Sequence, residues 1–351
     1  MLRTLHTVLK GGLAKNGVIG VNERNLTLIN AHNPRALMHR VNDKVETKVL
    51  ADAADIPNPA LYGVVRNGRD LSKLEEMMAA GGDMGCVIKP AKGSQGKGVL
   101  VVDGPLMGGW RLANGQRVDA AAVRYHVTNI LSGMYSLGGQ PDAAMIEYRV
   151  RFDPVLERIC FKGVPDVRVI VLSGVPAAAM VRLPTAASDG KANLHRGGVG
   201  VGVRINDGVT TSAMQGDRLI DRHPDTGEAL GDIAIPHWDA ILDMAARAYD
   251  VTGLGYVGVD IVLDGDRGPM LLELNGRPGL AIQIANRKGF REHLAAITAL
   301  KIEKRDVATR VRFAKRLYET SFGVVSSDDE AAAGAVVTQL PNKTPAAAEA
   351  A

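Results

Sequence analysis

The chain has 351 residues, 46% of them apolar and 23% charged, which is the composition of an ordinary folded protein with room for a sizeable core. Its net charge of +4 is small and its basic residues are dispersed, so we expect no nucleic-acid partner. No apolar run reaches the roughly 20 residues of a membrane-spanning helix, and Cys86 and Cys160 fit no metal-ligand spacing, so we expect no membrane span and two buried, reduced thiols in a cytoplasmic protein.

The N-terminal region, residues 1–41, is rich in glycine and asparagine and weakly patterned. It begins with the basic stretch Met1 to Leu5 and carries no acidic residue before Glu23. Because no small-residue cleavage site follows, the pattern favours a surface helix, with a transit peptide as the open alternative.

The rest of the chain mixes helices with short strands. Asn42 and Asp43 are good N-cap residues for the first helix, and Pro236 suits the first turn of a later one. The sequence pattern predicts helices over 44–50, 70–80, 120–132, 236–251 and, in several pieces, 282–318. It predicts strands over 86–90, 98–102 and 143–147, a hairpin of 166–171 with 177–182, and a second hairpin of 257–263 with a strand that ends at Asn275. Hairpins without a βαβ rhythm indicate an α+β fold, and the Ala- and Pro-rich tail at 326–351 is expected to be disordered.

The second hairpin carries the most informative residues. Glu273 and Asn275 are one pleat apart on an apolar strand and therefore point to the same face. The turn at 264–266 brings Asp260 near them, so two carboxylates and an amide meet the oxygen-ligand needs of Mg²⁺. A solvated hairpin face is the alternative, but Asp260 interrupts an apolar run in which an unpaired charge is costly. Arg277 follows where the chain leaves the strand and is placed to hold an anion.

A glycine-rich loop after the strand at 86–90 is a candidate phosphate site. Its glycines at 93, 96 and 98 let backbone N–H groups approach an anion closely, and Lys97 adds positive charge. The spacing matches neither the Walker A nor the GxGxxG pattern, and a plain hairpin loop is the alternative. Lys89 ends the strand before the loop and Lys44 lies in the first turn of its helix, so each is either a ligand of phosphate oxygens or a surface lysine.

Two further polar groups lie in the middle of the chain. Asp166 and Arg168 are one pleat apart, with Arg182 on the return strand, and they form either a structural ion pair or contacts to ribose and phosphate. A polar loop that ends in two glycines contains three more candidates: Asn193, His195 and Arg196. No serine or cysteine nucleophile accompanies His195, which favours phosphate and substrate contacts over general base catalysis, with a solvated loop as the alternative.

In their order along the chain, these motifs resemble those of an ATP-grasp carboxylate–amine ligase. They are Asp43-Lys44 with Thr47-Lys48, Val87-Ile88-Lys89-Pro90, the loop Gly93 to Gly98, Ile146-Glu147-Tyr148-Arg149-Val150, Asp260 and Glu273-Leu274-Asn275. Within that superfamily, Asp166-Val167-Arg168 together with the segment from Asn193 to Gly198 is most similar to the RimK-like group, the α-L-glutamate ligases. The resemblance covers about residues 42–278. It implies an ATP-grasp domain at 42–318, with a smaller lid-like subdomain at about 85–150 and a C-terminal subdomain with the metal site at about 151–318.

The resemblance also implies roles for individual residues. The nucleotide would be held by Lys44, Lys89, Ser94, Gln95, Gly96, Lys97, Glu147, Val150 and Asp166, with Glu157 as a competing ribose ligand. Magnesium, or manganese in its place, would be bound by Asp260, Glu273 and Asn275. Arg168, Asn193 and Arg196 would contact the transferred phosphate, while Arg277 and His195 would face the substrate.

The implied activity is that of an ATP- and Mg²⁺-dependent ligase, which activates a carboxylate as an acyl phosphate and joins it to an amine. The expected substrates are small molecules or peptides, with amino acids such as glutamate among them. A phosphotransferase on the same scaffold and a nucleotide-binding regulatory protein with lapsed activity are the alternatives. Members of this family usually carry an α/β domain before the first ATP-binding lysine, whereas only the short region 1–41 stands there in this chain. That region, the C-terminal helices or a second subunit of a homo-oligomer could supply the missing wall of the acceptor pocket.

Overall fold

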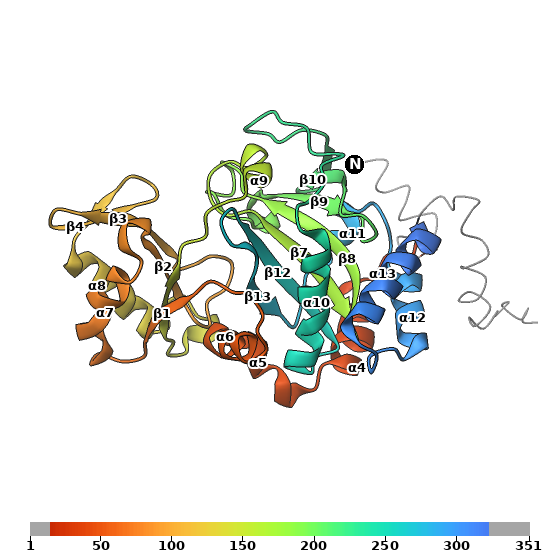
Figure 1. The fold of residues 1–351 in the computed structure, drawn as a ribbon, viewed down its shortest axis with the longest axis horizontal. Coiled ribbons are helices and arrows are strands. Elements are labelled where there is room, and N and C mark those ends of the chain that lie inside the picture. The colour runs from red at the N-terminus through yellow and green to blue at the C-terminus, as the bar shows by residue number, and fades with distance from the viewer. Residues whose placement is uncertain (1–14, 323–351) are drawn as a thin grey trace, which may run out of the picture.

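The computed structural model describes residues 15–322, which form two β-sheets lying side by side with helices around them (Figure 1). Every strand pair in both sheets is antiparallel, which confirms the α+β class. The surface helix predicted from Met1 and the tail at 326–351 lie outside the described residues. Within the described range, no helix is long and apolar enough to span a bilayer.

The smaller sheet has six strands in the order β1-β6-β2-β3-β4-β5. Their bounds are β1 Leu61–Val65, β2 Cys86–Pro90, β3 Leu100–Leu106, β4 Gly109–Leu112, β5 Arg117–Val118 and β6 Ala144–Tyr148. Helices α7 (Leu74–Ala79) and α8 (Ala120–Leu131) share one core with these strands, made of Val65, Leu74, Ile88, Val102, Val123, Val127 and Ile146 among others. Because β1 belongs to this sheet, we propose that the small subdomain begins near residue 61 rather than near 85.

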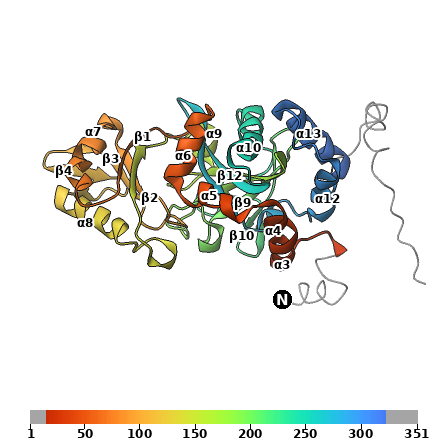
Figure 2. The ribbon, with the colours of Figure 1, turned by 90° about the horizontal axis from the view of Figure 1, so that it is seen from below.

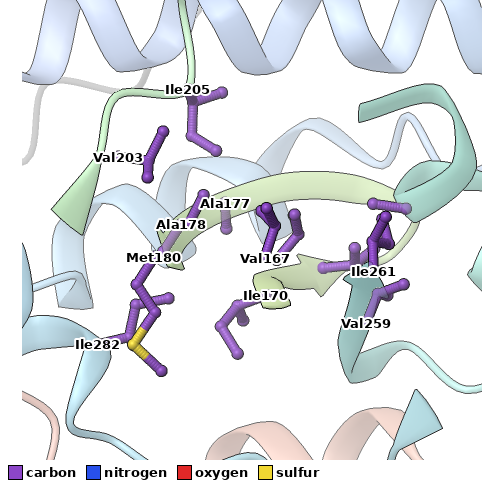
Figure 3. Close-up of a cluster of buried hydrophobic side chains, with 14 of the residues drawn as sticks. Val167, Ile170, Ala177, Ala178, Met180, Val203, Ile205, Val259, Ile261 and Ile282 are labelled. Atoms are coloured by element: carbon purple, nitrogen blue, oxygen red, sulfur yellow. The ribbon is translucent and has the colours of Figure 1, made fainter. Parts of the chain in front are cut away.

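The larger sheet has seven strands in the order β11-β10-β9-β8-β7-β12-β13. Their bounds are β7 Asp166–Leu172, β8 Val175–Leu183, β9 Val199–Val203, β10 Thr210–Gln215, β11 Arg218–Ile220, β12 Tyr256–Asp264 and β13 Gly268–Asn275. Both predicted hairpins are present as β7–β8 and β12–β13, and β7 pairs with β12 so that the hairpins adjoin. The main core gathers on these strands (Figure 3), with Val167, Ile170, Ala178, Met180, Val203, Val259 and Ile261 among its members.

The helices that follow the linker lie around the larger sheet: α9 Pro154–Arg158, α10 Trp238–Thr252, α11 Ile282–Ala285, α12 Arg291–Leu300 and α13 Val307–Phe322. Helix α10 packs against β7, β12 and β13, whereas α12 contacts β7 and β8. Helix α10 begins two residues later than predicted, because His237 takes a left-handed conformation (φ 58°) as its N-cap and Pro236 lies in the turn before it. Figure 2 shows α13 between α10 and α12, and α13 contacts both of these helices.

Residues 21–42 form short helical pieces that the sequence pattern did not predict. They are α3 Val21–Glu23, a π-helical turn Arg24–Ile29, α4 Asn30–His32, a 3₁₀ turn Arg35–Leu37 and α5 His39–Asn42. Asn33 attaches this segment to the larger sheet, since its Nδ2 donates to Tyr256 O at 2.7 Å and to Gly276 O at 3.1 Å, and Tyr256 N donates to its Oδ1 at 2.8 Å. The segment therefore packs as part of the C-terminal half of the molecule.

Three local predictions differ from the structure in their details. The helix predicted at 70–80 is divided into a 3₁₀ turn, Asp70–Lys73, and α7. The strand predicted from Gly98 begins at Leu100 instead, because Gly98 has a positive φ of 72° and still belongs to the loop. The helix predicted from residue 44 is confirmed as α6, Lys44–Ala53, and Asp43 caps it by accepting from Val45 N at 2.9 Å.

The two cysteines are free thiols. Cys86 is buried in the smaller sheet as expected, whereas Cys160 is only partly buried, which corrects that part of the expectation. Burial raises the pKa of each thiol to about 12. Neither thiol therefore ionises readily at neutral pH, which agrees with a site that does not use a cysteine nucleophile.

His293 on α12 makes the stability of the fold depend on pH. Its ring is buried, and its centroid lies 6.2 Å from that of Phe290 and 6.4 Å from that of Tyr318. Burial lowers the pKa of His293 to about 4, although a hydrogen bond with the backbone of Ala177 acts in the opposite direction. The folded protein then binds fewer protons at this group than the unfolded chain, in which the pKa is about 6.5. The stabilisation is complete above about pH 6.5 and is lost as the pH falls through about 4.

We expect the free energy of unfolding to fall by up to about 3 kcal/mol across this window because of His293 alone. Urea unfolding of the full chain at pH 7 and at pH 4 measures the difference. The variant His293→Gln cannot titrate in this range, so its free energy of unfolding should change less between the two pH values. An identical change in both proteins would assign the pH dependence to other groups.

Candidate functional site

The candidate site lies on one face of the larger sheet, where β7, β12 and β13 run side by side. Asp260 in the central strand pairs with Arg168 of β7 on one side and with Glu273 of β13 on the other. Residues directly opposite one another in adjacent strands share a face, so these three side chains form a row. The register of β13 shifts immediately before Glu273, with Leu272 as the extra residue, and such a bulge re-aims the neighbouring side chain.

Asp260 is completely buried and binds two arginines. Arg168 Nε and Nη2 donate to its two oxygens at 2.6 and 2.5 Å, and Arg182 Nη2 donates to Oδ2 at 2.8 Å. Burial alone would raise the pKa of Asp260, but the charges of the two guanidinium groups outweigh it and lower the pKa to about 2. Asp260 is therefore ionised at neutral pH and held in one orientation by a two-pronged contact.

Arg182 also holds Asp166, its neighbour in register on β7. Its Nε and Nη2 donate to the two carboxylate oxygens of Asp166 at 2.6 and 2.5 Å. Arg182 is thus shared by Asp166 and Asp260. The sequence left open whether this hairpin forms a structural ion pair or contacts ribose and phosphate. The ion pair is present, and Arg182 is the partner of Asp166.

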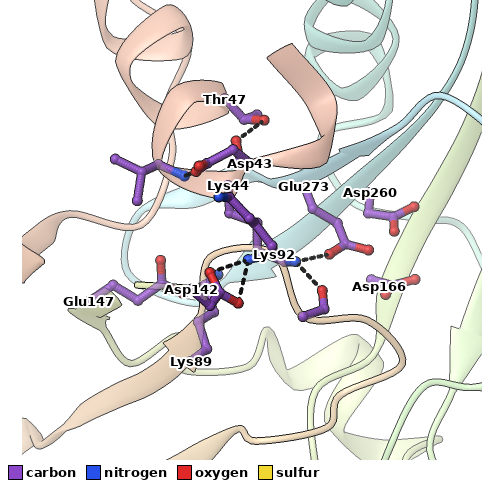
Figure 4. Close-up of polar contacts among 12 residues, drawn as sticks. Asp43, Lys44, Thr47, Lys89, Lys92, Asp142, Glu147, Asp166, Asp260 and Glu273 are labelled. Atoms are coloured by element: carbon purple, nitrogen blue, oxygen red, sulfur yellow. Dashed lines mark hydrogen bonds and ion pairs between the residues drawn. The ribbon is translucent and has the colours of Figure 1, made fainter. Parts of the chain in front are cut away.

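Glu273 is the accessible carboxylate of the row. Its side chain is 34% exposed, and its Oε2 lies 3.8 Å from Lys44 Nζ. Figure 4 shows Glu273, Asp260 and Asp166 next to one another, with Lys44 reaching toward Glu273 from α6. Asn275 lies one pleat further along β13, and its Oδ1 accepts from Arg277 N at 2.9 Å, which leaves the side chain of Arg277 exposed at the end of the strand.

A buried cluster of two lysines and one glutamate lies at the edge of the smaller subdomain. Lys48 Nζ of α6 lies 3.0 Å from Glu147 Oε2, and Lys89 Nζ of β2 lies 2.5 Å from Glu147 Oε1, with all three side chains at most 8% exposed. Burial would raise the pKa of Glu147, but the two ammonium groups outweigh it and lower the pKa. Two positive charges therefore face one negative charge away from water, and a second anion would complete the balance.

Lys44, one helical turn before Lys48 on α6, connects the glycine-rich loop with Glu273. Its Nζ donates to Gly93 O at 2.6 Å, and Asp142 fixes the base of the loop by accepting from Lys92 N at 3.0 Å (Figure 4). A cation in the first turn of a helix is unfavourable by itself, since the macrodipole is positive there. Gly93 O and the carboxylate of Glu273 lie beside the ammonium group of Lys44 and stabilise its positive charge at this helix end, so the charge by itself does not require a ligand.

The tip of the glycine-rich loop faces the larger subdomain. Gln95 and Gly96 both have positive φ, 58° and 67°. A Cβ on Gly96 would lie 3.3 Å from the side chain of Lys191, so the tip and the polar loop of the larger subdomain come close. The segment from Ser94 to Lys97 therefore bridges the two subdomains next to Lys44.

The polar loop of the larger subdomain is ordered by its own hydrogen bonds. Asn193 Oδ1 accepts from His195 N at 3.0 Å, which caps a single 3₁₀ turn. Thr185 Oγ1 donates to Gly197 O at 2.8 Å and holds the end of the loop. The side chains of His195 and Arg196 are exposed on this turn, whereas the oxygen of Asn193 is engaged in the cap.

The linker between the sheets is fixed to the second hairpin. Tyr148 Oη donates to Asp264 Oδ2 at 3.0 Å, and Arg151 N donates to the same oxygen at 2.8 Å. Val150 lies between them, partly buried against Tyr148. Glu157 is exposed on α9, whereas both oxygens of Asp166 are bound by Arg182, so the two candidate ribose ligands differ in accessibility.

The structure thus brings most of the predicted residues together and adds two. From the sequence, Lys48 was named only as part of the first motif and Arg182 only in the ion pair that was left open, yet each holds a carboxylate of the site. A signal existed for both, since Lys48 follows Lys44 by one helical turn and Arg182 lies opposite Asp166 on the predicted hairpin. Among residues 15–322, no three His, Cys, Asp or Glu side chains cluster as a metal site. The residues predicted to bind Mg²⁺ are the carboxylates Asp260 and Glu273 and the amide of Asn275, and their oxygen atoms are of the kind that this ion prefers.

Comparison with known proteins identifies the family. Residues 23–299 match the family model described as sugar-transfer associated ATP-grasp. Because this match covers most of the chain, the protein belongs to that family. The resemblance to ATP-grasp enzymes is confirmed, and with it the ATP-grasp fold of two α+β subdomains.

Two curated relatives confirm the similarity to the α-L-glutamate ligases. The chain is 26% identical over 142 residues to a probable alpha-L-glutamate ligase of Aeromonas salmonicida (strain A449). It is 28% identical over 141 residues to one of Syntrophotalea carbinolica (strain DSM 2380 / NBRC 103641 / GraBd1). Each match covers 40% of this chain and spans only 36% of the relative's length.

Solved structures with similar chain traces are more distant. D-alanyl-alanine synthetase A from Vibrio cholerae is 13% identical, with a TM-score of 0.45 over 76% of this chain and 66% of that one. The ATP-grasp ligase PsnB complexed with minimal precursor is 16% identical, with a TM-score of 0.41 over 76% of this chain and 63% of that one.

Proposed function

We propose that the protein is an ATP- and Mg²⁺-dependent ligase that activates a carboxylate as an acyl phosphate and joins it to an amine. One observation supports this most directly: Lys44 bridges Gly93 O of the glycine-rich loop and Glu273, and one helical turn later on α6 Lys48 belongs to the buried Lys48–Lys89–Glu147 cluster. The cluster has one positive charge in excess, which suits phosphate oxygens. The carboxylates across from it suit the cation that accompanies a nucleoside triphosphate. Membership of the ATP-grasp family supports the same assignment.

The proposed nucleotide site lies between the two sheets. Lys44 and Lys89 contact phosphate oxygens, and the backbone from Ser94 to Lys97, including Gln95 and Gly96, covers them. Adenine lies against the linker that begins at Glu147 and continues to Val150. The carboxylate of Glu147 is bound by Lys48 and Lys89, so we propose that it positions the two lysines and that only its backbone contacts the base. Either Asp166 or Glu157 binds the ribose.

The proposed magnesium ligands are Glu273, Asn275 and Asp260, with manganese as a substitute ion. An ionised carboxylate offers about four lone-pair sites. In Asp260, three of these lone-pair sites accept N–H groups of Arg168 and Arg182, one on Oδ1 and two on Oδ2. A position on Oδ1 therefore remains for a cation beside Glu273. Bound magnesium would neutralise part of the negative charge of the phosphate groups.

The reaction requires no nucleophile from the protein. An oxygen of the substrate carboxylate bonds to the γ-phosphorus of ATP as the bond to ADP breaks. The amine nitrogen then bonds to the acyl carbon, phosphate leaves with the bonding electrons, and the nitrogen loses a proton. In this proposal Asn193 and Arg196 orient the transferred phosphate, and Lys44 and Lys89 offset its charge. Arg168 acts through Asp260, which both of its donor groups bind.

The substrates we propose are a small carboxylate or peptide and an amine, with an amino acid such as glutamate as one of them. The side chains of Arg277 and His195 are exposed, and we propose that they bind a substrate carboxylate. The family description, sugar-transfer associated, adds carboxylated and amino sugars to the candidates. A homo-oligomer that completes the acceptor pocket also belongs to this proposal.

Hydroxylamine trapping tests the proposed activity without knowledge of the acceptor. The full chain is incubated with ATP, magnesium and hydroxylamine and with one carboxylate at a time from a panel of amino acids, peptides and sugar acids. We expect at least one carboxylate to give its hydroxamate together with an equal amount of ADP and phosphate, because hydroxylamine replaces the amine at the acyl phosphate. Repeating the assay with amines in place of hydroxylamine then identifies the acceptor.

Other outcomes select the alternatives. A stable phosphorylated product that hydroxylamine does not consume would identify a phosphotransferase. Tight ATP binding without ADP release for any carboxylate would favour a regulatory protein with lapsed activity.

A further inference from the structure

The loop that follows β13 is held by the N-terminal segment on both sides of Arg277. Asn33 Nδ2 donates to Gly276 O at 3.1 Å, just before this residue. Arg24 Nη1 donates to Pro278 O at 3.0 Å, just after it. Two residues that precede the first helix of the nucleotide site therefore fix the backbone of the loop that carries the proposed substrate ligand.

This loop lies over the same face of the larger sheet as the proposed magnesium ligands. Positions 258 and 260 are one pleat apart on β12 and therefore face the same side. A Cβ on Gly258 would lie 2.8 Å from Cβ of Pro278, so Pro278 rests directly on this position. Gly258 and Asp260 are separated by roughly 7 Å along the strand. Arg24, which binds the carbonyl oxygen of Pro278, therefore lies at the rim of the proposed site.

Arg24 has a positive charge without a carboxylate partner among the described residues. Its Nε and Nη2 donate to Asn25 Oδ1 at 3.2 and 2.8 Å, and its other partner is the carbonyl oxygen of Pro278. The carboxylate of the preceding Glu23 is bound by Arg291 instead. A guanidinium has five N–H donors. Two of them, one on each terminal nitrogen, thus have no acceptor within residues 15–322, and a carboxylate could accept from them.

The backbone at Arg24 is also unusual. Residues Arg24–Ile29 form a π-helical turn, in which Leu28 and Ile29 are buried in the main core. Turns of this kind are rare and occur frequently at functional sites. The two apolar side chains anchor the turn, whereas Arg24 is partly exposed. The guanidinium group is therefore held in place by the fold and is accessible to a ligand.

We propose that Arg24 and Arg277 together bind a substrate carboxylate that does not react. A guanidinium stabilises the charged form of a carboxylate and makes its oxygens less basic. Two such contacts would weaken the oxygen that attacks the γ-phosphorus. They suit a different carboxylate, which orients the substrate and remains in the product.

Because the proposal rests on the ligase function, it narrows the substrates of that reaction. One of them carries a carboxylate in addition to the reacting group: it is either an acyl donor with two carboxylates or an amine that bears a carboxylate. The N-terminal segment, through Arg24, then forms one wall of the substrate pocket.

Isothermal titration calorimetry of the full chain tests this proposal with three matched pairs of probes. Glutamate is compared with glutamine, glucarate with gluconate, and alanine with alaninamide, and the members of each pair differ by one carboxylate. All titrations contain a saturating non-hydrolysable ATP analogue and magnesium. In at least one pair, we expect the probe with the additional carboxylate to bind about 10-fold or more tightly. The first two pairs represent acyl donors and the third represents amine acceptors. Absence of a preference in all three pairs up to millimolar concentration would overturn the proposal.

Two variants at position 24 assign the preference to this arginine. Arg24→Gln removes the charge and keeps an amide N–H for the oxygen of Pro278. We expect it to reduce the preference by about 10-fold and to change the Kd of the probe without the additional carboxylate little. Arg24→Lys keeps the charge but lacks the planar pair of donors, so its preference should be intermediate. The matched control Arg35→Gln removes an exposed charge from the same segment and should leave both Kd values unchanged.

The outcomes separate binding of the carboxylate from simple support of the loop. If Arg24 only holds the loop, Arg24→Gln should weaken both members of a pair equally, and that result would overturn the assignment. An unchanged preference in Arg24→Gln would also overturn it. Failure of the ligase proposal is a separate result, because it is seen as absence of hydroxamate and ADP, whereas calorimetry with the ATP analogue measures binding without turnover.

Discussion

Replacing Glu273 with glutamine is expected to reduce the rate of ADP formation by at least about 100-fold while the protein remains folded. Glu273 is the accessible carboxylate of the Arg168–Asp260–Glu273 row, and its charge is the one best placed to hold a cation against the transferred phosphate. Glutamine keeps the shape of the side chain and removes only the charge. The rate of ADP release at saturating ATP and magnesium, measured for the carboxylate that gives a hydroxamate, provides the test.

The control for this variant is Glu76→Gln. Glu76 is exposed on α7 in the smaller subdomain, and its replacement should leave the rate unchanged. Circular dichroism and urea unfolding of both variants separate a loss of chemistry from a loss of structure. A folded Glu273→Gln protein that keeps the full rate would remove Glu273 from the proposed metal site.

The part of the site that depends on short-range structure was predictable from the sequence. Glu273 lies opposite Asp260 because a tight turn joins β12 to β13, and the alternation of side chains along each strand fixes the shared face. The cap at Asp43 and the hairpin that pairs Asp166 with Arg182 follow from equally local patterns. In each case the residues lie within one element or one hairpin.

The contacts between distant segments could not be predicted in this way. Arg168 and Asp260 are 92 residues apart, and their contact exists only because β7 pairs with β12. No periodicity within either hairpin reports that pairing. The contact of Lys48 with Glu147 was missed for the same reason, since Glu147 comes from β6 of the smaller sheet. The strand β1 pairs with β6 across a long stretch of sequence, and our proposal of an earlier start for the small subdomain rests on this pairing.

Two of the predicted site residues are buried and have partners of opposite charge within the protein. Glu147 was expected to contact adenine, yet its carboxylate is enclosed by two lysines. Arg168 was expected to contact phosphate, yet it binds Asp260 with two donor groups. A buried charge is tolerated only with a partner of opposite sign, so the interior of the site consists of ion pairs and its ligand-facing groups are those at the rim. By this criterion we propose that Lys44, Glu273 and Arg196 contact the reacting groups.

The variant Asp260→Asn is expected to lower the free energy of unfolding by about 3–5 kcal/mol. The loss of this carboxylate leaves the charge of Arg168 buried without its partner and leaves Arg182 with Asp166 alone. Urea unfolding of the full chain at pH 7 measures the change. The control Asp266→Asn breaks the ion pair with Arg151, in which the side chain of Arg151 is 57% and that of Asp266 is 62% exposed. It should lower the free energy of unfolding by less than about 1 kcal/mol.

A double variant separates the cost of an unpaired charge from the value of the ion pair itself. In Arg168→Met with Asp260→Leu both charges are replaced by apolar side chains, so no unpaired guanidinium remains between β7 and β12. This protein should be more stable than Asp260→Asn, because a buried ion pair repays little beyond its own desolvation. It should nevertheless lose ligase activity, since Asp260 no longer supports Glu273 at the proposed metal site. A double variant that is less stable than Asp260→Asn would show instead that the ion pair contributes net stability to the larger sheet.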